Sequence, residues 1–370
     1  MRIQELDGLR AIAVLMVAYS HYMGYSESLG GLQGTGAKNG WLGVDLFFIL
    51  SGFLITSILI KLRDQEHFFA PFYKRRALRI FPPYFLALAV YLGASLIAGK
   101  PASVGFWAQY VFYTTSLRVG FPAEIYYAVI VPVQLGLGVL WSLSVEEVYY
   151  TIWAPVVRYT SKKGFTAVLI GMIVAAPLLR WWLHTPGYPE LYNFFCRMDA
   201  LADGSILALL MQSRSVALTS WKRWDNLFNL FAAMVSMATV ALWIYLHGDR
   251  SSVVLSALGT TMADLSFALI IFAILRYAGS QAWPLRFLRV KWLRSIGMVS
   301  YSLYLFHYPL WYLVRQWVGT WGLSLRETVF TQAILALILS FGVAYALWYG
   351  MESRILAWKD RNVPSSAHPG

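Results

Sequence analysis

The sequence has few charged residues and only one cysteine. Of its 370 residues, 13% are charged and 58% are hydrophobic, whereas soluble domains carry about 25% charged residues. The single cysteine, Cys196, excludes a disulfide within the chain and leaves no set of thiolates for a metal cluster. We therefore expect Cys196 to be a packed core thiol, and the composition predicts an integral membrane protein rather than a soluble one.

Acidic residues are scarcer than basic ones. The chain has 18 Asp and Glu against 30 Lys and Arg, which gives a net charge of +12. In a soluble protein such an excess would suggest a nucleic-acid partner. Here the basic residues gather in alternate loops between apolar segments, as membrane insertion requires. We therefore expect the lipid bilayer, and no nucleic acid, as a partner.

Long apolar runs dominate the chain. Windows of about 18 or more residues, long enough to cross a bilayer, cover residues 8–24, 41–61, 80–98, 138–157, 165–184, 192–212, 226–247, 253–277, 293–314 and 325–350. The stretch 99–137 is aromatic but short and is interrupted by Pro122 and Pro132, which favours an interfacial or re-entrant helix. The sequence predicts an all-α integral membrane protein with about ten transmembrane helices.

The positions of Lys and Arg predict the orientation. Basic residues follow the second, fourth, sixth and eighth windows and recur in the tail, while the alternate loops at 24–40, 185–191 and 248–252 carry few. By the positive-inside rule, both termini are expected in the cytoplasm. We expect one transmembrane domain over residues 1–355 and a flexible cytoplasmic tail over 356–370.

Arg10 and His21 bracket the apolar run 11–20. Eleven helical positions return to nearly the same face, with a rise of about 16 Å. An ionisable residue inside a membrane is costly and is a functional-site hypothesis by default. Two ordinary interpretations remain open: His21 could reach the interface, and Arg10 could pair with Asp7 at a cytoplasmic helix end.

Asp45 lies about one turn into the second window, which enters from the same surface that His21 approaches. A carboxylate on one imidazole nitrogen fixes the tautomer and leaves the other nitrogen as a general base. We therefore predict that Asp45 orients His21.

A basic cluster precedes the third window, with Lys74, Arg75, Arg76 and Arg79 within six residues. In a helix Arg76 and Arg79 share a face, as do Arg75 and Arg79, and paired guanidinium groups suit phosphates. The same cluster could instead attract anionic lipid.

Further polar residues fall inside apolar windows: Glu146, Glu147, Arg197, Asp199 and His307. Arg197 and Asp199 are two positions apart and should point to different faces, toward different partners. So many intramembrane charges predict a hydrated internal cavity.

Several ordered motifs resemble those of the acyltransferase-3 membrane family. They are Arg10-x10-His21, the segment from Gly43 to Phe53 (GVDLFFILSGF), Arg76-x-x-Arg79, the segment from Trp141 to Glu147 (WSLSVEE) and the segment from Ser300 to His307 (SYSLYLFH). The resemblance covers about residues 5–350. The extracytoplasmic SGNH hydrolase-like domain of some members is not expected in this chain.

The resemblance implies transfer of an acyl group, commonly acetyl, from cytoplasmic acyl-CoA to a hydroxyl of an extracytoplasmic glycan or a small molecule. It implies Arg10 and His21 as the signature pair, Arg76 and Arg79 as the donor-binding loop, and acyl-CoA as a co-substrate with no tightly bound cofactor or metal. The bacterial cytoplasmic membrane is the expected location. Matched supporting positions are Phe47, Phe48, Ser51, Gly52, Ser142, Glu146, Tyr304 and His307.

Two other classes of function remain open. A proton-coupled transporter or flippase would use the same intramembrane charges and would work without acyl-CoA. A non-catalytic glycan-binding or scaffold protein would not need His21.

Overall fold

The computed structural model describes residues 3–23, 38–97, 103–117, 137–185, 189–212, 225–246, 248 and 252–363, and these residues form no β-strand. The longer helices are α1 (Gln4–Met23), α3 (Gly43–Leu62), α4 (Phe69–Ile97), α7 (Trp141–Tyr159), α8 (Lys162–Leu183), α9 (Met198–Gln212), α11 (Asp225–Tyr245), α12 (Thr260–Arg276), α14 (Lys291–Val318) and α15 (Leu325–Leu347). Shorter helices are α5 (Val104–Val111), α13 (Trp283–Leu288) and α16 (Ser353–Asn362). The all-α prediction is confirmed.

Six helical segments within the described residues are long and apolar enough to cross a membrane: Gly40–Leu62, Phe69–Ile97, Lys162–Leu183, Asp225–Tyr245, Leu255–Arg276 and Leu325–Asn362. The chain is therefore a multi-pass membrane protein. Each of the ten expected windows falls on a helix, but a count of ten spans and the orientation of the termini stay predictions. One of the other helices, α9, has only 15 residues, and α7 carries Glu146, Glu147 and Arg158.

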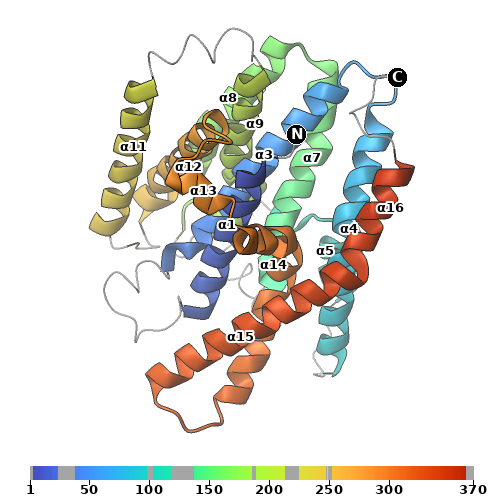
Figure 1. Ribbon diagram of the computed structural model, residues 1–370, viewed down its shortest axis with the longest axis vertical. Helices are drawn as coiled ribbons and strands as arrows, with labels where there is room; N and C mark the ends of the chain where they lie inside the picture. Colours follow the sequence, from blue (N-terminus) through green and yellow to red (C-terminus); the bar gives the residue numbers. More distant parts are fainter. Residues whose placement is uncertain are drawn as a thin grey trace.

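Helices α1, α3, α9 and α14 pack together in the middle of the bundle, with α1 against α14 and α3 against α9 (Figure 1). Glycines make the second contact close: a Cβ at Gly52 would strike the backbone carbonyl of Leu201, and one at Gly204 would strike that of Ile49. Small residues allow helix backbones in membranes to approach in this way. By contrast, α11 stands at one edge of the molecule.

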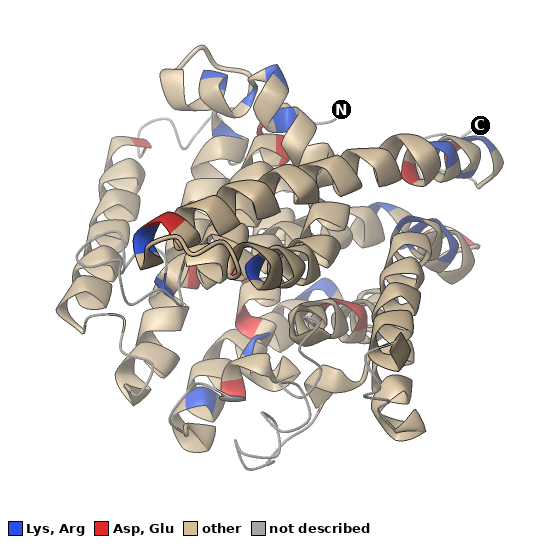
Figure 2. Ribbon diagram, turned by 90° about the horizontal axis from the view of Figure 1, so that it is seen from below, with Lys and Arg blue, Asp and Glu red and all other residues tan. Residues whose placement is uncertain are grey.

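Helix α1 is unbroken from Gln4 to Met23. The rise from Arg10 to His21 along it is therefore about 16 Å, as the sequence predicts. Figure 2 shows long stretches of helix without charged residues, which suits contact with lipid tails.

The stretch 99–137 and the tail each fall partly outside the described residues. Within the first, α5 has eight residues, which is too short to cross a bilayer. In the second, residues 356–362 are helical, because α15 continues through a π-helical turn, Trp348–Glu352, into α16. The domain boundary at residue 355 and the flexibility of the tail stay predictions, and residues 364–370 lie outside the described part of the chain.

Candidate active site

A cavity of about 1110 Å³ lies between α1, α3, α4, α7, α14 and α16. Its basic lining residues include Arg10 from α1 together with Arg76 and Arg79 from α4. Lys61, at the end of α3, and Lys359, on α16, belong to the lining as well. Drug-sized ligand pockets have volumes of about 300–1,000 Å³, so this cavity has room for a large anionic ligand.

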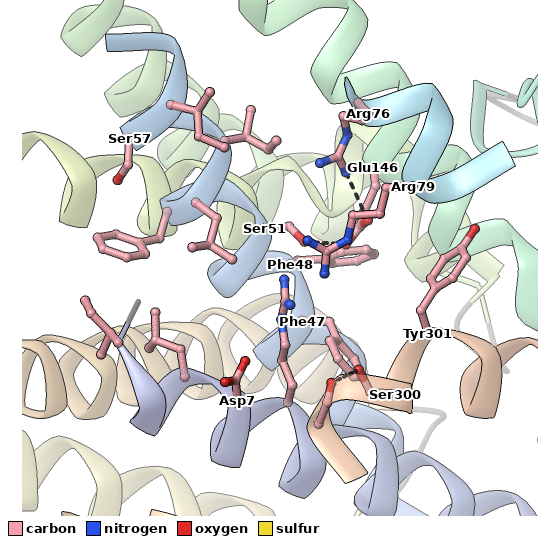
Figure 3. Close-up of a pocket in the computed structure, with 18 of the residues that line it drawn as sticks. Asp7, Phe47, Phe48, Ser51, Ser57, Arg76, Arg79, Glu146, Ser300 and Tyr301 are labelled. Carbon is pink, nitrogen blue, oxygen red and sulfur yellow. Dashed lines mark hydrogen bonds and ion pairs between the residues drawn. The ribbon is translucent and has the colours of Figure 1, made fainter. Parts of the chain in front are cut away.

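The four residues of the expected basic cluster do not all lie in the same place. Arg76 and Arg79 line the cavity, and Figure 3 shows both side chains directed into it from the same helix. Arg75 is not among the described residues that line the cavity, and its guanidinium donates to Asp360 (2.6 Å) and to the Val363 carbonyl (2.7 Å). Lys74 is exposed. The helical spacing alone does not separate Arg75 from Arg76, because Arg79 shares a helix face with each of them; the ion pair with Asp360 is what holds Arg75 away from the other two.

Arg76 is held by several groups of α7. It lies 3.8 Å from a carboxylate oxygen of Glu146 and 3.7 Å from one of Glu147, and its guanidinium lies over the Tyr150 ring, 3.3 Å from the ring centre. Ser51 donates to Glu146 at 2.6 Å. The motifs of the second and fourth windows therefore meet beside the arginines (Figure 3).

Tyr304 lines the same cavity from α14. Its hydroxyl lies 2.7 Å from that of Ser142 and donates to the Val139 carbonyl at 2.9 Å. The Phe47 ring packs edge-on against it, with ring centres 6.3 Å apart. Of the supporting residues that the resemblance selects, six line the cavity, and Gly52 and His307 are not among its described lining residues; the six are Phe47, Phe48, Ser51, Ser142, Glu146 and Tyr304.

His21 contacts His307. The Nδ1 atom of His21 lies 2.7 Å from Nε2 of His307, and the two rings stack with centres 5.0 Å apart. His307 is fully buried, and its ring centre lies 5.6 Å from that of Tyr304. No histidine is among the described residues that line the cavity, so the cavity approaches the histidine pair through Tyr304.

The structure gives Asp45 a different partner from the one expected. Asp45 is fully buried and forms an ion pair with Arg197. The reason is the level at which α3 begins: a Cβ at Gly43 would strike the Ala13 carbonyl, so Asp45 lies beside the middle of α1 and not beside His21. The prediction that Asp45 orients His21 is wrong: Asp45 pairs with Arg197, and the Nδ1 atom of His21 contacts His307.

Arg197 and Asp199 have different partners, as their spacing predicts. Asp199 accepts two hydrogen bonds from Arg180, at 3.0 and 2.6 Å, and Arg180 also donates to Thr261. We missed Arg180 in the sequence, although an arginine within an apolar window was the available signal. Cys196 is buried, as expected, and its carbonyl accepts from Arg180.

Two more residues were missed. Tyr150 lies under Arg76, and Glu352 lines the cavity from beyond the end of the last apolar window, where Ser302 donates to it at 2.6 Å. Nothing in the local pattern distinguished Tyr150 from the other tyrosines. Within the described residues, no three His, Cys, Asp or Glu side chains are grouped closely enough to hold a metal ion.

Comparison with known proteins places the chain in a family. The family model described as an acyltransferase domain matches residues 3–349. The chain is 25% identical over 332 residues to a peptidoglycan O-acetyltransferase of Listeria monocytogenes and 27% identical over 323 residues to an O-acetyltransferase of Staphylococcus aureus. These matches cover 83% and 82% of this chain but 49% and 50% of the relatives.

Nodulation protein 10 of Rhizobium leguminosarum is 27% identical over 356 residues, with 90% of each chain covered. The chain thus spans about half the length of the two O-acetyltransferases and nearly all of the nodulation protein. No solved structure matches it. From the family match over nearly its whole length, the chain belongs to the acyltransferase-3 family.

Proposed function

We propose that this protein is a membrane O-acyltransferase that moves an acyl group, in the first instance acetyl, from cytoplasmic acyl-CoA to a hydroxyl of an extracytoplasmic cell-envelope glycan. Family membership and the relatives' names as O-acetyltransferases support the reaction class. The observation that carries the proposal is the cavity, which holds Arg10, Arg76 and Arg79 and reaches Tyr304 beside the histidine pair.

The cavity suits the shape of coenzyme A. The phosphates of coenzyme A match Arg76 and Arg79, since guanidinium groups bind phosphate with paired hydrogen bonds. The pantetheine arm of coenzyme A is thin, and when fully extended it is about 15–20 Å long. That length matches the rise of about 16 Å from Arg10 to His21 along α1.

In this proposal His21 is the general base. Its imidazole removes the proton from the acceptor hydroxyl while the hydroxyl oxygen attacks the thioester carbonyl. The tetrahedral intermediate then expels the coenzyme A thiolate, and the imidazolium returns the proton to that sulfur. The products are the acyl ester and free coenzyme A, and His21 is neutral again.

A proton-coupled transporter is the rival function, and the buried charges argue against it. Arg197 pairs with Asp45, and Arg180 pairs with Asp199. Ion pairs of this kind compensate each other's burial. They therefore supply a structural reason for these charges that requires no proton pathway.

The test uses purified protein in sealed liposomes. With acetyl-CoA on one side and a soluble peptidoglycan fragment on the other, we expect release of coenzyme A thiol that requires the acceptor, together with an acetyl ester on the glycan. Protein-free liposomes are the control. A protein that moves a solute across the bilayer without acyl-CoA, and forms no ester with it, would contradict the proposal.

A further inference from the structure

The helical turn that carries His307 is held by side chains from two other helices. Pro309 has no N–H to donate to the Leu305 carbonyl and its ring crowds that group. In place of that N–H, the Tyr91 hydroxyl of α4 donates to the Leu305 carbonyl at 3.1 Å. The Tyr22 hydroxyl of α1 donates to the His307 carbonyl at 3.3 Å. The backbone of this turn is therefore fixed from both sides.

The contacts of His307 determine which of its nitrogens carries hydrogen. Nδ1 lies 2.7 Å from the Tyr304 carbonyl oxygen, and a carbonyl can only accept, so Nδ1 is the donor. The ring is fully buried among the aromatic rings of Tyr22, Tyr304 and Tyr308, surroundings that disfavour a charged imidazolium. Nε2 of the neutral ring is therefore an acceptor.

The same argument extends to His21. Its Nδ1 lies 2.7 Å from Nε2 of His307. Because Nε2 accepts, Nδ1 of His21 must carry the hydrogen, and the lone pair of His21 is on Nε2. His21 therefore donates to His307, and His307 donates to the Tyr304 carbonyl.

We propose that His307 is a positioning residue that fixes His21 in the Nδ1–H tautomer and thereby sets Nε2 as the basic nitrogen. This inference rests on the proposed function, in which His21 is the base. When His21 takes a proton on Nε2, its Nδ1–H still donates to His307, so the acceptor stabilises the imidazolium as it forms. His307 exchanges no proton with the substrate.

Two variants separate positioning from other roles. His307→Gln retains a side-chain carbonyl that can accept from His21, whereas His307→Leu retains bulk but no acceptor. We expect His307→Leu to lower kcat by about 10–100-fold, the range seen when the hydrogen-bond partner that orients a metal-ligating histidine is removed, with KM for acyl-CoA unchanged. His307→Gln should recover most of the lost kcat. His67→Gln, at an exposed histidine, is the matched control and should be unchanged.

A spectroscopic measurement on the wild-type protein is independent of activity. Nitrogen NMR of ¹⁵N-histidine-labelled protein in lipid distinguishes protonated from unprotonated ring nitrogens, and His21→Gln identifies the His21 signals among the six histidines. We expect His21 with hydrogen on Nδ1 and not on Nε2, and a mixture of tautomers in His307→Leu.

Each other outcome overturns the positioning role. An Nε2–H tautomer for His21 would do so, as would wild-type kcat in His307→Leu. Equal losses in the Gln and Leu variants would also overturn it. They would show that His307 acts as a base, which an amide cannot replace, and not as a hydrogen-bond acceptor. Failure of the proposed function is a separate result: the wild-type protein would then form no ester from acetyl-CoA, whatever the tautomer of His21.

Discussion

Removal of either α4 arginine that lines the cavity, Arg76 or Arg79, should weaken donor binding and spare turnover. A hydrogen bond to a charged group contributes about 1.5–3 kcal/mol, and 1.4 kcal/mol corresponds to a tenfold change in affinity. Arg79→Gln should therefore raise KM for acyl-CoA about 10–100-fold. Turnover at saturating donor should change little, because the lost binding is the same in the ground state and the transition state.

Arg76→Gln should behave differently from Arg79→Gln. Arg76 lies within 4 Å of Glu146 and Glu147, whose side chains are only 15% and 17% exposed. Its removal leaves those carboxylates without their counter-charge, so this variant should also lower the unfolding temperature in detergent. The net gain from phosphate binding at Arg76 is smaller, since the phosphate competes with two carboxylates for the guanidinium. We expect a rise in KM of about tenfold.

Arg75→Gln is the matched control on the same helix. It removes the same charge, but Arg75 is not among the described residues that line the cavity, and its guanidinium contacts Asp360 and the Val363 carbonyl instead. Steady-state kinetics with varied acyl-CoA should show an unchanged KM. If Arg75→Gln and Arg79→Gln raised KM equally, the cluster would act through its overall charge on lipid or topology, and the assignment of phosphate binding to Arg79 would be refuted.

Three other changes test the fold and its orientation. Cysteine labelling of intact cells should modify Ser26→Cys and spare Gln65→Cys, and the reverse pattern would contradict a cytoplasmic donor. Asp45→Asn should leave the Arg197 charge uncompensated and cost about 3–5 kcal/mol of stability, measured by unfolding in detergent, and a shifted pH–rate profile at normal stability would contradict the ion-pair role. Gly52→Ala should cost about 1–3 kcal/mol as its methyl meets the α9 backbone, and wild-type stability would show that the helices can separate freely.

The sequence predicted the helices because their signal is local. Each apolar window falls on a helix, since a run of apolar residues has to satisfy its own backbone groups in lipid. The sequence also predicted that Arg79 shares a helix face with Arg76 and with Arg75, which depends only on the helical repeat. That Arg75 contacts Asp360 instead depends on how α16 packs against α4. Helix α16 was missed because four of the ten residues 353–362 are charged, and their helix continues from α15 rather than from an apolar run of their own.

The partner of His21 could not be predicted from local pattern. Asp45 was expected there because two antiparallel helices with a short loop between them should begin and end at one level. Instead α3 begins beside Ala13 of α1, which is a matter of close backbone packing that depends on the whole bundle. His307 is 286 positions from His21, so their contact arises from the packing of α1 against α14.

The central claim is that His21 acts as the base on a donor whose phosphates are bound elsewhere. The most direct test measures acyl transfer and coenzyme A binding on the same preparation of His21→Ala and wild type. We predict a loss of transfer of about 10²–10⁴-fold, the usual contribution of a general base, with coenzyme A binding intact. Near-normal transfer by a correctly inserted His21→Ala protein would contradict the account.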